Sequence, residues 1–246
     1  MMRPQKTVYQ EINLSGNKMK VYEYSPEKGT GLKNTIVALG FFDGVHIAHR
    51  ELIGKTVSLG EELGLSPTVF TFTAEGKIKS GAPRLYSTKE RLEILEALGI
   101  ENVILVDFSD IAELSAEDFV RISLIEHFGA KAVVAGYNFR FGKGARGNRE
   151  MLTSLMEEAG LSAFIEEEIS YEGKSVSSTL VRSYLAEGDV RSARAILCAP
   201  YFISGRVESG NRVGKTLGFP TINVPFLEGQ INLRRGVYLT GVKIGD

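Results

Sequence analysis

Residues 37–53 read VALGFFDGVHIAHRELI, and this stretch decides the fold. It continues an apolar run from Asn34 that does not alternate with polar residues, which is typical of a strand buried on both faces of a sheet. A turn flanked by glycines follows at 40–44, and residues 45–63 have the spacing of a helix that closes at Gly64. The stretch therefore predicts a strand, a sharp turn and a helix in direct succession.

The same alternation continues along the chain. We expect strands at 34–40, 66–72, 102–108, 132–135 and 163–169, and helices at 45–63, 88–98, 115–128, 149–159, 180–186 and 190–197. Strands that alternate with helices favour an α/β fold with an open, mostly parallel sheet covered on both faces. Such sheets bind ligands beyond the carboxyl ends of their strands, which is where the turn at 40–44 is expected.

His46 and His49 stand at the start of the first long helix, three residues apart and so on one helical face. A helix N-terminus attracts phosphate, and glycine lets the backbone approach it closely. We therefore predict a nucleotide-phosphate site here. Two surface histidines, or half of a metal site, are the other interpretations, although the sequence holds just one further histidine, His127.

Two later stretches add polar groups. Ser177, Ser178 and Thr179 precede a predicted helix that carries Arg182, and three hydroxyls with an arginine exceed what a helix cap needs. They are suited to hold a triphosphate. Residues 136–148, GYNFRFGKGARGN, form a glycine-rich cationic loop. Its G-x-G-x-x-G spacing does not follow a strand directly, so a dinucleotide site is not predicted there.

Composition narrows the functional classes. The chain has 246 residues, a formal net charge of −1 and one cysteine, Cys198. The charge gives no broad basic surface for nucleic acid, and a lone cysteine excludes an intrachain disulfide. No segment has the apolar length of a signal peptide or a membrane span. We expect a cytoplasmic protein with small-molecule ligands; the sequence does not indicate an oligomeric state.

The pattern of apolar and polar residues changes near Pro200. Residues 201–246 show short alternating stretches separated by glycine, which favour part of a small β-domain, with GVYLTGVKIGD at 236–246 as a strand. Residues 209–216, SGNRVGKT, approach a P-loop but have serine where its first glycine belongs. We divide the chain into a domain at 1–186 and a linker helix with the small β-domain at 187–246.

Five segments in this order resemble those of the prokaryotic bifunctional riboflavin kinase/FAD synthetases. They are GFFDGVHIAH from 40, GYNFRFGKGARG from 136, VSSTLVRSYLAEGDVRSARAIL from 176, PYFISGRV from 200 and GKTLGFPTIN from 214. The resemblance implies a Rossmann-like sheet of the HxGH nucleotidyltransferase type, followed by part of a riboflavin kinase barrel. It also implies transfer of AMP from ATP to FMN with Mg²⁺, giving FAD and pyrophosphate.

The resemblance assigns roles to residues of this chain. His46, His49 and Arg182 are the expected catalytic residues. The expected ATP-binding residues are Gly40, Phe41, Phe42, Asp43, Gly44, Ala48, Asn138, Arg140, Ser177, Ser178 and Thr179, with Phe139 in the same loop as Asn138. Gly218, Pro220, Thr221 and Asn223 match the kinase's PTAN-type motif, and Thr221 and Asn223 are expected to meet Mg²⁺.

Three departures from the family pattern bear on activity. Ala48 stands for the glycine of HxGH, Asn138 stands for an aspartate, and residues 71–80 lack a Pro-His-Pro segment. The kinase's catalytic glutamate is expected beyond residue 246, so we predict no substantial riboflavin kinase activity. The leading interpretation is an FMN adenylyltransferase; a weakened protein that binds flavin or nucleotide, including riboflavin, and a transferase for another acceptor are the alternatives.

Overall fold

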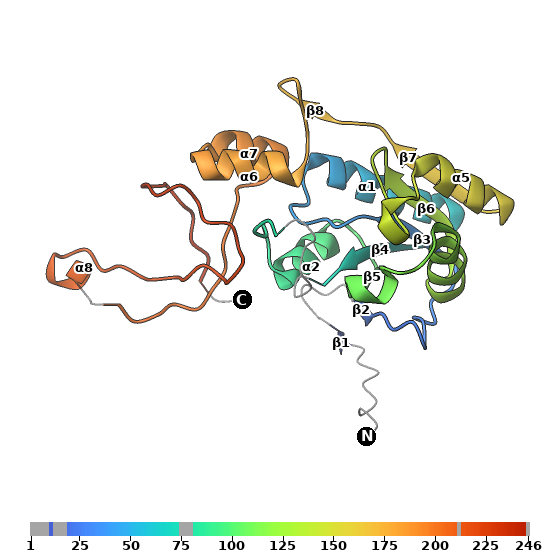
Figure 1. Cartoon of the computed structure of the whole chain (residues 1–246). Helices are drawn as coiled ribbons and strands as arrows, with labels where there is room; N and C mark the ends of the chain where they lie inside the picture. The colour runs from blue at the N-terminus through green and yellow to red at the C-terminus, as the bar shows by residue number, and fades with distance from the viewer. Residues whose placement is uncertain (1–9, 12–18, 74–80, 211–212, 245–246) are drawn as a thin grey trace.

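The computed structural model describes residues 10–11, 19–73, 81–210 and 213–244, and within them a seven-stranded sheet organises the part of the molecule drawn at the right of Figure 1. The strand order is β1-β2-β5-β4-β3-β6-β7. β1 pairs antiparallel with β2, and the other pairs are parallel. The strands are β1 (Gln10–Glu11), β2 (Lys20–Glu23), β3 (Thr35–Leu39), β4 (Ser66–Phe72), β5 (Asn102–Val106), β6 (Ala130–Gly136) and β7 (Ser162–Glu166).

The order of the strands creates a switch point beside β3. From β3 the chain moves outward to β4 and β5, and it then returns to the other side of β3 to build β6 and β7. Leu39 and Ala135 are paired at the carboxyl ends of β3 and β6. Ligands of open α/β sheets bind in the crevice at such a point. The predicted turn at 40–44 leaves the sheet at this position.

Helices cover both faces of the sheet. Ile36 and Ala38 of β3 pack with α1 (Ile47–Leu63) and α2 (Thr88–Ala97) on one face. Val37 and Leu39 pack with η1 (Phe119–His127) and α5 (Arg149–Glu158) on the other. The run without alternation at 34–40 is thus buried on both sides, as predicted.

The helix boundaries have local causes. Gly64 ends α1 in the left-handed conformation, with φ of 65°. Ser87 and Glu90 form a capping box at the start of α2, in which each side chain bonds the other residue's backbone N–H. Asp107 accepts a hydrogen bond from the Ser109 N–H and starts α3 (Phe108–Ile111), so β5 ends at Val106 and the strand predicted to 108 is too long.

The remaining elements correct some expectations. The helix predicted at 115–128 is one turn of α-helix, α4 (Ala116–Asp118), followed by the π-helix η1. A short 3-10 turn, η2 (Lys143–Ala145), lies in the glycine-rich loop. The turn at Glu172 and Gly173, both with positive φ, joins the small hairpin β8 (Ser170–Tyr171) and β9 (Lys174–Ser175), which the sequence did not reveal as strands.

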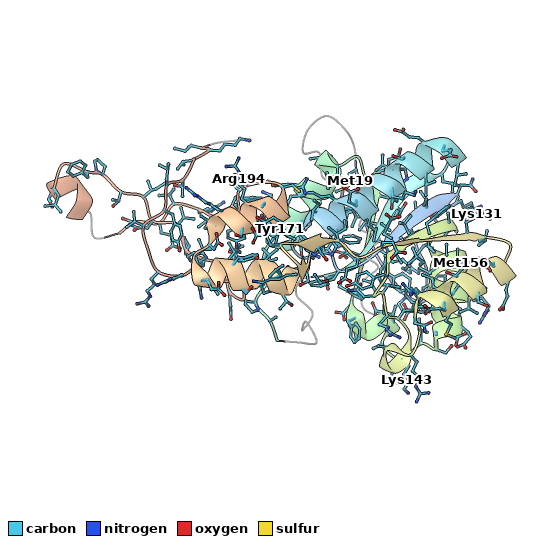
Figure 2. All side chains as sticks on the ribbon, turned by 90° about the horizontal axis from the view of Figure 1, so that it is seen from above. Met19, Lys131, Lys143, Met156, Tyr171 and Arg194 are labelled. Atoms are coloured by element: carbon cyan, nitrogen blue, oxygen red, sulfur yellow. The ribbon has the colours of Figure 1, made fainter. Side chains whose placement is uncertain are left out.

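A third apolar cluster lies beside the sheet. It joins α6 (Ser178–Glu187) and α7 (Val190–Leu197) to residues from two distant segments. Leu85 and Tyr86 precede α2, and Ile231 comes from the C-terminal segment; all three are buried. Figure 2 shows the sheet and α5, with Met156, at the opposite end of the molecule from α8 (Val213–Thr216).

The expected β-domain does not form a sheet in the part of 201–244 that the structure describes. That part holds α8 and isolated bridges, Glu208 with Asn223 and Gln230 with Arg84, and residues 236–244 form no strand. Its apolar side chains lack a packed face, since Phe219 is 78% exposed and Leu239 is fully exposed. An alternating sequence whose apolar side chains are not buried against a partner does not form a stable set of β-sheet hydrogen bonds.

Two further predictions concern membrane-spanning helices and the Pro-His-Pro segment. No helix among the described residues has the length and apolar character needed to cross a bilayer. The segment that departs from the Pro-His-Pro pattern lies mostly at 74–80, outside the described residues.

Candidate active site

The turn at 40–44 is tight and its backbone is strained. Phe42 and Val45 have φ of 53° and 42°, in the left-handed region that a β-branched residue such as Val45 rarely adopts. A Cβ on Gly44 would lie 2.7 Å from Cδ1 of Leu85, so the close approach requires glycine. Strain of this kind persists where the surrounding structure enforces it, and it is concentrated at functional sites. Phe42 is fully buried, so it anchors the turn in the core.

The two histidines stack on each other at the start of α1. Their ring centroids are 3.7 Å apart, and His46 is the N-cap, with Nδ1 accepting a hydrogen bond of 3.4 Å from the His49 N–H. This bond assigns the proton of a neutral His46 to Nε2. Burial lowers the pKa of His46 to about 4, and burial together with His46 lowers that of His49 well below its usual value. Both imidazoles are therefore neutral at pH 7 in the ligand-free protein.

His49 contributes a polar atom that no protein group satisfies. Its Nδ1 is buried and has no hydrogen-bond partner among the described residues. Phe42 packs edge-on against the ring, with centroids 5.0 Å apart. Because most buried polar atoms in folded proteins are paired, an orphaned nitrogen beside a strained turn indicates a ligand. Ala48, between the two histidines, is half-buried and packs on the α6–α7 cluster.

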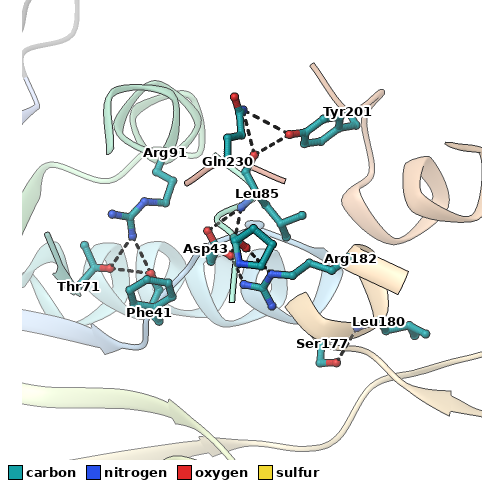
Figure 3. A network of polar contacts seen from close by, with 11 residues as sticks. Phe41, Asp43, Thr71, Leu85, Arg91, Ser177, Leu180, Arg182, Tyr201 and Gln230 are labelled. Atoms are coloured by element: carbon teal, nitrogen blue, oxygen red, sulfur yellow. Dashed lines mark hydrogen bonds and ion pairs between the residues drawn. The ribbon is translucent and has the colours of Figure 1, made fainter. Parts of the chain in front are cut away.

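A buried ion pair joins the turn to α6. Asp43 is 1% exposed, and its Oδ2 accepts from Nη2 of Arg182. The Leu85 N–H donates to the same carboxylate, 3.1 Å from Oδ1, and Nε of Arg182 donates to the Pro83 carbonyl at 2.7 Å. Figure 3 shows these contacts converging behind the turn. Burial raises the pKa of Asp43, and the Arg182 guanidinium opposes that rise.

The start of α6 lies against the same turn. Ser177 is its N-cap, with Oγ accepting from the Leu180 N–H at 3.2 Å, so one of the three predicted hydroxyls serves as a cap. A Cβ on Gly44 would lie 3.8 Å from Oγ of Ser178, which brings that hydroxyl next to the turn. Thr179 is exposed. Two helix N-termini thus meet at Gly44, and each can donate free backbone N–H groups to an anion.

The loop after β6 shares this edge of the sheet without touching the histidines. Asn138 and Arg140 are exposed, and among the described residues no hydrogen bond or ion pair joins them to His46, His49 or Arg182. The Phe139 ring stacks on Phe141, with centroids 5.7 Å apart. These residues therefore flank the crevice, and a bound ligand would have to bridge them to the turn.

A buried arginine that sequence reasoning missed braces the site from α2. Arg91 is 2% exposed; Nη1 donates to the Phe41 carbonyl at 2.8 Å and to Thr71, and Nη2 donates to the Phe72 carbonyl at 2.9 Å. Its guanidinium also lies over the Phe41 ring, 5.2 Å from the centroid. Burial lowers the pKa of Arg91 to about 10. Arg91 stands four residues before Leu95, so helical spacing places it on the buried face of α2. This spacing is the feature of the sequence that could have revealed a buried arginine.

Comparison with known proteins identifies the family. The family model described as FAD synthetase matches residues 29–180 of this chain, and a second, described as riboflavin kinase, matches residues 197–246. The chain belongs to the FAD synthetase family. The first match covers strands β3 to β7, the turn, the histidines and the start of α6, and the second match covers the C-terminal segment.

Several members of the FAD synthetase family are similar over most of this chain. The bifunctional riboflavin kinase/FMN adenylyltransferase of Bacillus subtilis is 33% identical, over 85% of this chain and 68% of its own length. That of Escherichia coli K12 is 34% identical, over 84% of this chain and 67% of its own length. A crystal structure from Streptococcus pneumoniae described as a macrolide-efflux protein has a TM-score of 0.79 at 29% identity, covering 89% of this chain and 73% of that one.

The kinase-like motif lies apart from the site at the turn. Asn223 is bridged to Glu208, whose N–H donates to the Asn223 carbonyl at 2.8 Å. A Cβ on Gly214 would lie 3.1 Å from Oγ1 of Thr221, so this threonine faces α8. Gly218 has φ of 82°, and Pro220, two residues later, is exposed. The motif residues therefore gather around α8.

Among the residues that the structure places in this site, the side chains that could bind a metal ion are few. The described residues contain no group of three or more histidine, cysteine, aspartate or glutamate side chains suited to a metal ion. Asp43, the carboxylate at the turn, is occupied by Arg182 and the Leu85 N–H. Mg²⁺ in nucleotide sites is bound largely by phosphate oxygens and water, with few protein ligands. A Mg²⁺ ion held mainly by phosphate oxygens and water would therefore need no carboxylate from this turn.

Proposed function

We propose that this chain is an FMN adenylyltransferase, which transfers AMP from ATP to FMN and releases pyrophosphate. The observation that carries the proposal is the meeting of two helix N-termini at Gly44, with His46, His49 and Arg182 around it. Membership in the FAD synthetase family, and relatives named for FMN adenylyl transfer, support the choice of substrates. We further propose that residues 1–186 carry this reaction and that it takes place in the cytoplasm.

The triphosphate is held from two sides. The neutral His46 keeps its Nδ1 on the His49 N–H, so Nε2–H is the donor that it offers to a phosphate oxygen. His49 supplies the second imidazole. At the start of α6, Ser178 and Thr179 offer hydroxyls, and Nη1 of Arg182 makes no hydrogen bond to a described residue. Asn138 and Arg140, exposed at the neighbouring strand end, are positioned to cover the nucleotide.

The flavin fits an aromatic row at the end of β4. Phe72 is half-buried, and its ring centroid lies 6.1 Å from that of Phe41 and 5.7 Å from that of Phe108, which is 41% exposed. Phe72 ends β4, Phe41 lies in the turn after β3 and Phe108 begins α3 after β5, so the three rings gather at the carboxyl edge of the sheet that also carries the phosphate turn. Aromatic side chains bind flat ring systems by stacking, so we place the isoalloxazine ring here.

The chemistry requires positioning and neutralisation of charge. A phosphate oxygen of FMN attacks the α-phosphorus of ATP, a new P–O bond forms, and the bond from the α-phosphorus to the bridging oxygen breaks with release of pyrophosphate. The nucleophile is already anionic, so no general base is required. His46, His49, Arg182 and the helix ends stabilise negative charge on the phosphates. Mg²⁺ bound to the phosphates would neutralise further charge.

The test is direct formation of FAD. Purified protein is incubated with FMN, ATP and Mg²⁺, and FAD and pyrophosphate are measured by chromatography and a coupled assay. We expect FAD from the wild-type chain and a loss of about 100-fold in kcat for His46→Ala, since removing one donor to a developing anion has about this effect. His127→Ala, which removes the histidine bonded to Tyr24 far from the turn, is the control and should retain activity.

The remaining outcomes separate the alternatives. Nucleotide or flavin binding by calorimetry without release of pyrophosphate would identify a binding protein that has lost turnover, a result that the substitutions at Ala48 and Asn138 would explain. Release of pyrophosphate with another acceptor but without FAD would assign a different acceptor. Either result would contradict the proposal that this chain transfers AMP from ATP to FMN.

A further inference from the structure

The residues just before α2, together with its first turn, lie between the active site and the C-terminal segment. We define residues 84–90 as the strap. On one side, the Leu85 N–H donates to Asp43, and the Leu85 side chain packs where a Cβ on Gly44 would be. Just before the strap, the Pro83 carbonyl accepts from Nε of Arg182. This short segment therefore holds both the turn and Arg182 in position.

The other side of the strap is held by residues of the C-terminal segment. Tyr201 donates its hydroxyl to the Leu85 carbonyl at 2.9 Å, and Nε2 of Gln230 donates to the same carbonyl at 3.4 Å and to the Tyr201 hydroxyl at 3.3 Å. Figure 3 shows the two side chains meeting at Leu85, opposite Asp43. Leu85 is fully buried, so its carbonyl depends on these two donors.

Further contacts join the same two segments. Arg84 exchanges backbone hydrogen bonds of 2.8 Å with Gly229 and Ile231, as in a short parallel bridge. Glu90, 1% exposed, accepts hydrogen bonds from the N–H and the hydroxyl of Ser204. The Tyr86 ring stacks on Tyr201, with centroids 5.4 Å apart. The strap is thus fixed along its length by residues that lie within the riboflavin kinase match.

From this arrangement we infer that Tyr201 and Gln230 are positioning residues of the adenylyltransferase site. They act through Leu85, whose N–H orients the Asp43 carboxylate and thereby the guanidinium of Arg182 on the triphosphate. The inference rests on the proposed function. Part of the region related to riboflavin kinase is therefore required for the adenylyl transfer assigned to the sheet.

The test uses the full chain with Tyr201→Phe, Gln230→Leu and the double variant. Tyr201→Phe keeps the ring on Tyr86 and removes the donor to Leu85. Since one donor remains in each single variant, we expect a two- to threefold rise in the KM for ATP there and about a tenfold rise in the double variant, where the carbonyl is left unpaired. The KM for FMN should stay within twofold, because the strap contacts the phosphate side.

A matched control is available in the same segment. Tyr238 also donates its hydroxyl to a backbone carbonyl, that of Arg234, at 2.6 Å, and it does not touch the strap. Tyr238→Phe should leave both KM values unchanged. Hydrogen exchange gives a readout independent of turnover: in the double variant the Leu85 amide should exchange faster, while the amides of β3 stay protected.

The outcomes distinguish this inference from the proposed function. No FAD from the wild-type chain overturns the proposed function; the dissociation constant for ATP, measured by calorimetry, then replaces KM in the comparison. Equal KM or dissociation constants for ATP in the wild type and the double variant would overturn the inference. Equal rises for ATP and FMN, or the same rise in Tyr238→Phe, would show a general loss of structure and would also overturn it.

Discussion

The neutral state of His46 predicts how the stability of this protein depends on pH. Burial lowers the pKa of His46 from 6.5 to about 4 in the folded chain, while the unfolded chain keeps the ordinary value. Between these two values the unfolded state binds more protons, so the free energy of unfolding falls as the pH falls. The contribution of His46 is fully present above pH 6.5. Linkage gives a loss of about 2 kcal/mol at pH 5 and about 3 kcal/mol at pH 4.

His46→Asn isolates this contribution. Asparagine is a good N-cap, so it can accept the His49 N–H in place of His46 Nδ1, and it does not titrate. Unfolding by urea at pH 7.5 and at pH 5, at constant ionic strength, should show the wild type losing about 2 kcal/mol more than the variant. Buried His49 is present in both proteins, so its own contribution largely cancels in the difference.

His127→Asn is the control for removing a histidine elsewhere, and it should retain the pH dependence that His46 gives. Equal losses in the wild type and in His46→Asn would contradict the assignment of a neutral, buried His46. The same result would remove the reason for taking its Nε2–H as the donor to phosphate.

Further substitutions test the contacts behind the turn. Arg182→Lys should raise the KM for ATP about tenfold in steady-state assays, because lysine cannot bond Asp43 and the phosphates through one planar group; an unchanged KM would exclude this role. Arg91→Met should lower the free energy of unfolding by about 2 kcal/mol in urea titrations, because the Phe72 carbonyl loses its arginine donor and the Phe41 carbonyl keeps only that of Thr71; a loss under 1 kcal/mol would contradict the bracing role. Gly44→Ala should cost about 1–3 kcal/mol in the same titration, because its Cβ would lie 2.7 Å from Leu85, and full stability would refute the tight approach.

The sheet and its first turn could be predicted because their causes are local. A continuous apolar run predicts a doubly buried strand, and Gly64 or Ser87 predicts a helix end from the residue alone. Strands β3 and β4 and helices α1, α2, α5 and α7 accordingly lie within one or two residues of their predicted bounds. His46 and His49 lie at the start of α1, directly after the turn that follows β3, at the edge where the rule for open sheets expects a ligand.

The partners within the site could not be predicted, because they depend on burial and on distant pairing. Asp43 and Arg182 are 139 residues apart in sequence, and no local pattern joins them. Arg91 bonds mainly backbone carbonyls, which every residue type carries, so its acceptors leave no trace in the sequence. The charge of the histidines follows from burial, which spacing does not show.

The alternating pattern near the C-terminus misled for a related reason. Alternation predicts a strand only where one face is buried against a partner, and Val237 and Leu239 are fully exposed. The buried part of this segment is instead the part that contacts the strap, where Gln230 is 6% and Ile231 is 5% exposed. Packing against the strap, rather than the alternating pattern, decides which of these residues are buried.

The strap has a consequence for cooperativity in folding. Leu85 and Tyr86 are buried on one side by the turn and α6 and on the other by Tyr201 and Ile231, so release of the C-terminal segment would expose a strip of core. Detachment of the C-terminal segment would therefore also destabilise the turn at 40–44. The FAD synthetase region and the contacting part of the riboflavin kinase region thus share one unit of local unfolding. Recombination between relatives would then preserve the site only if the strap and its C-terminal partners came from the same parent.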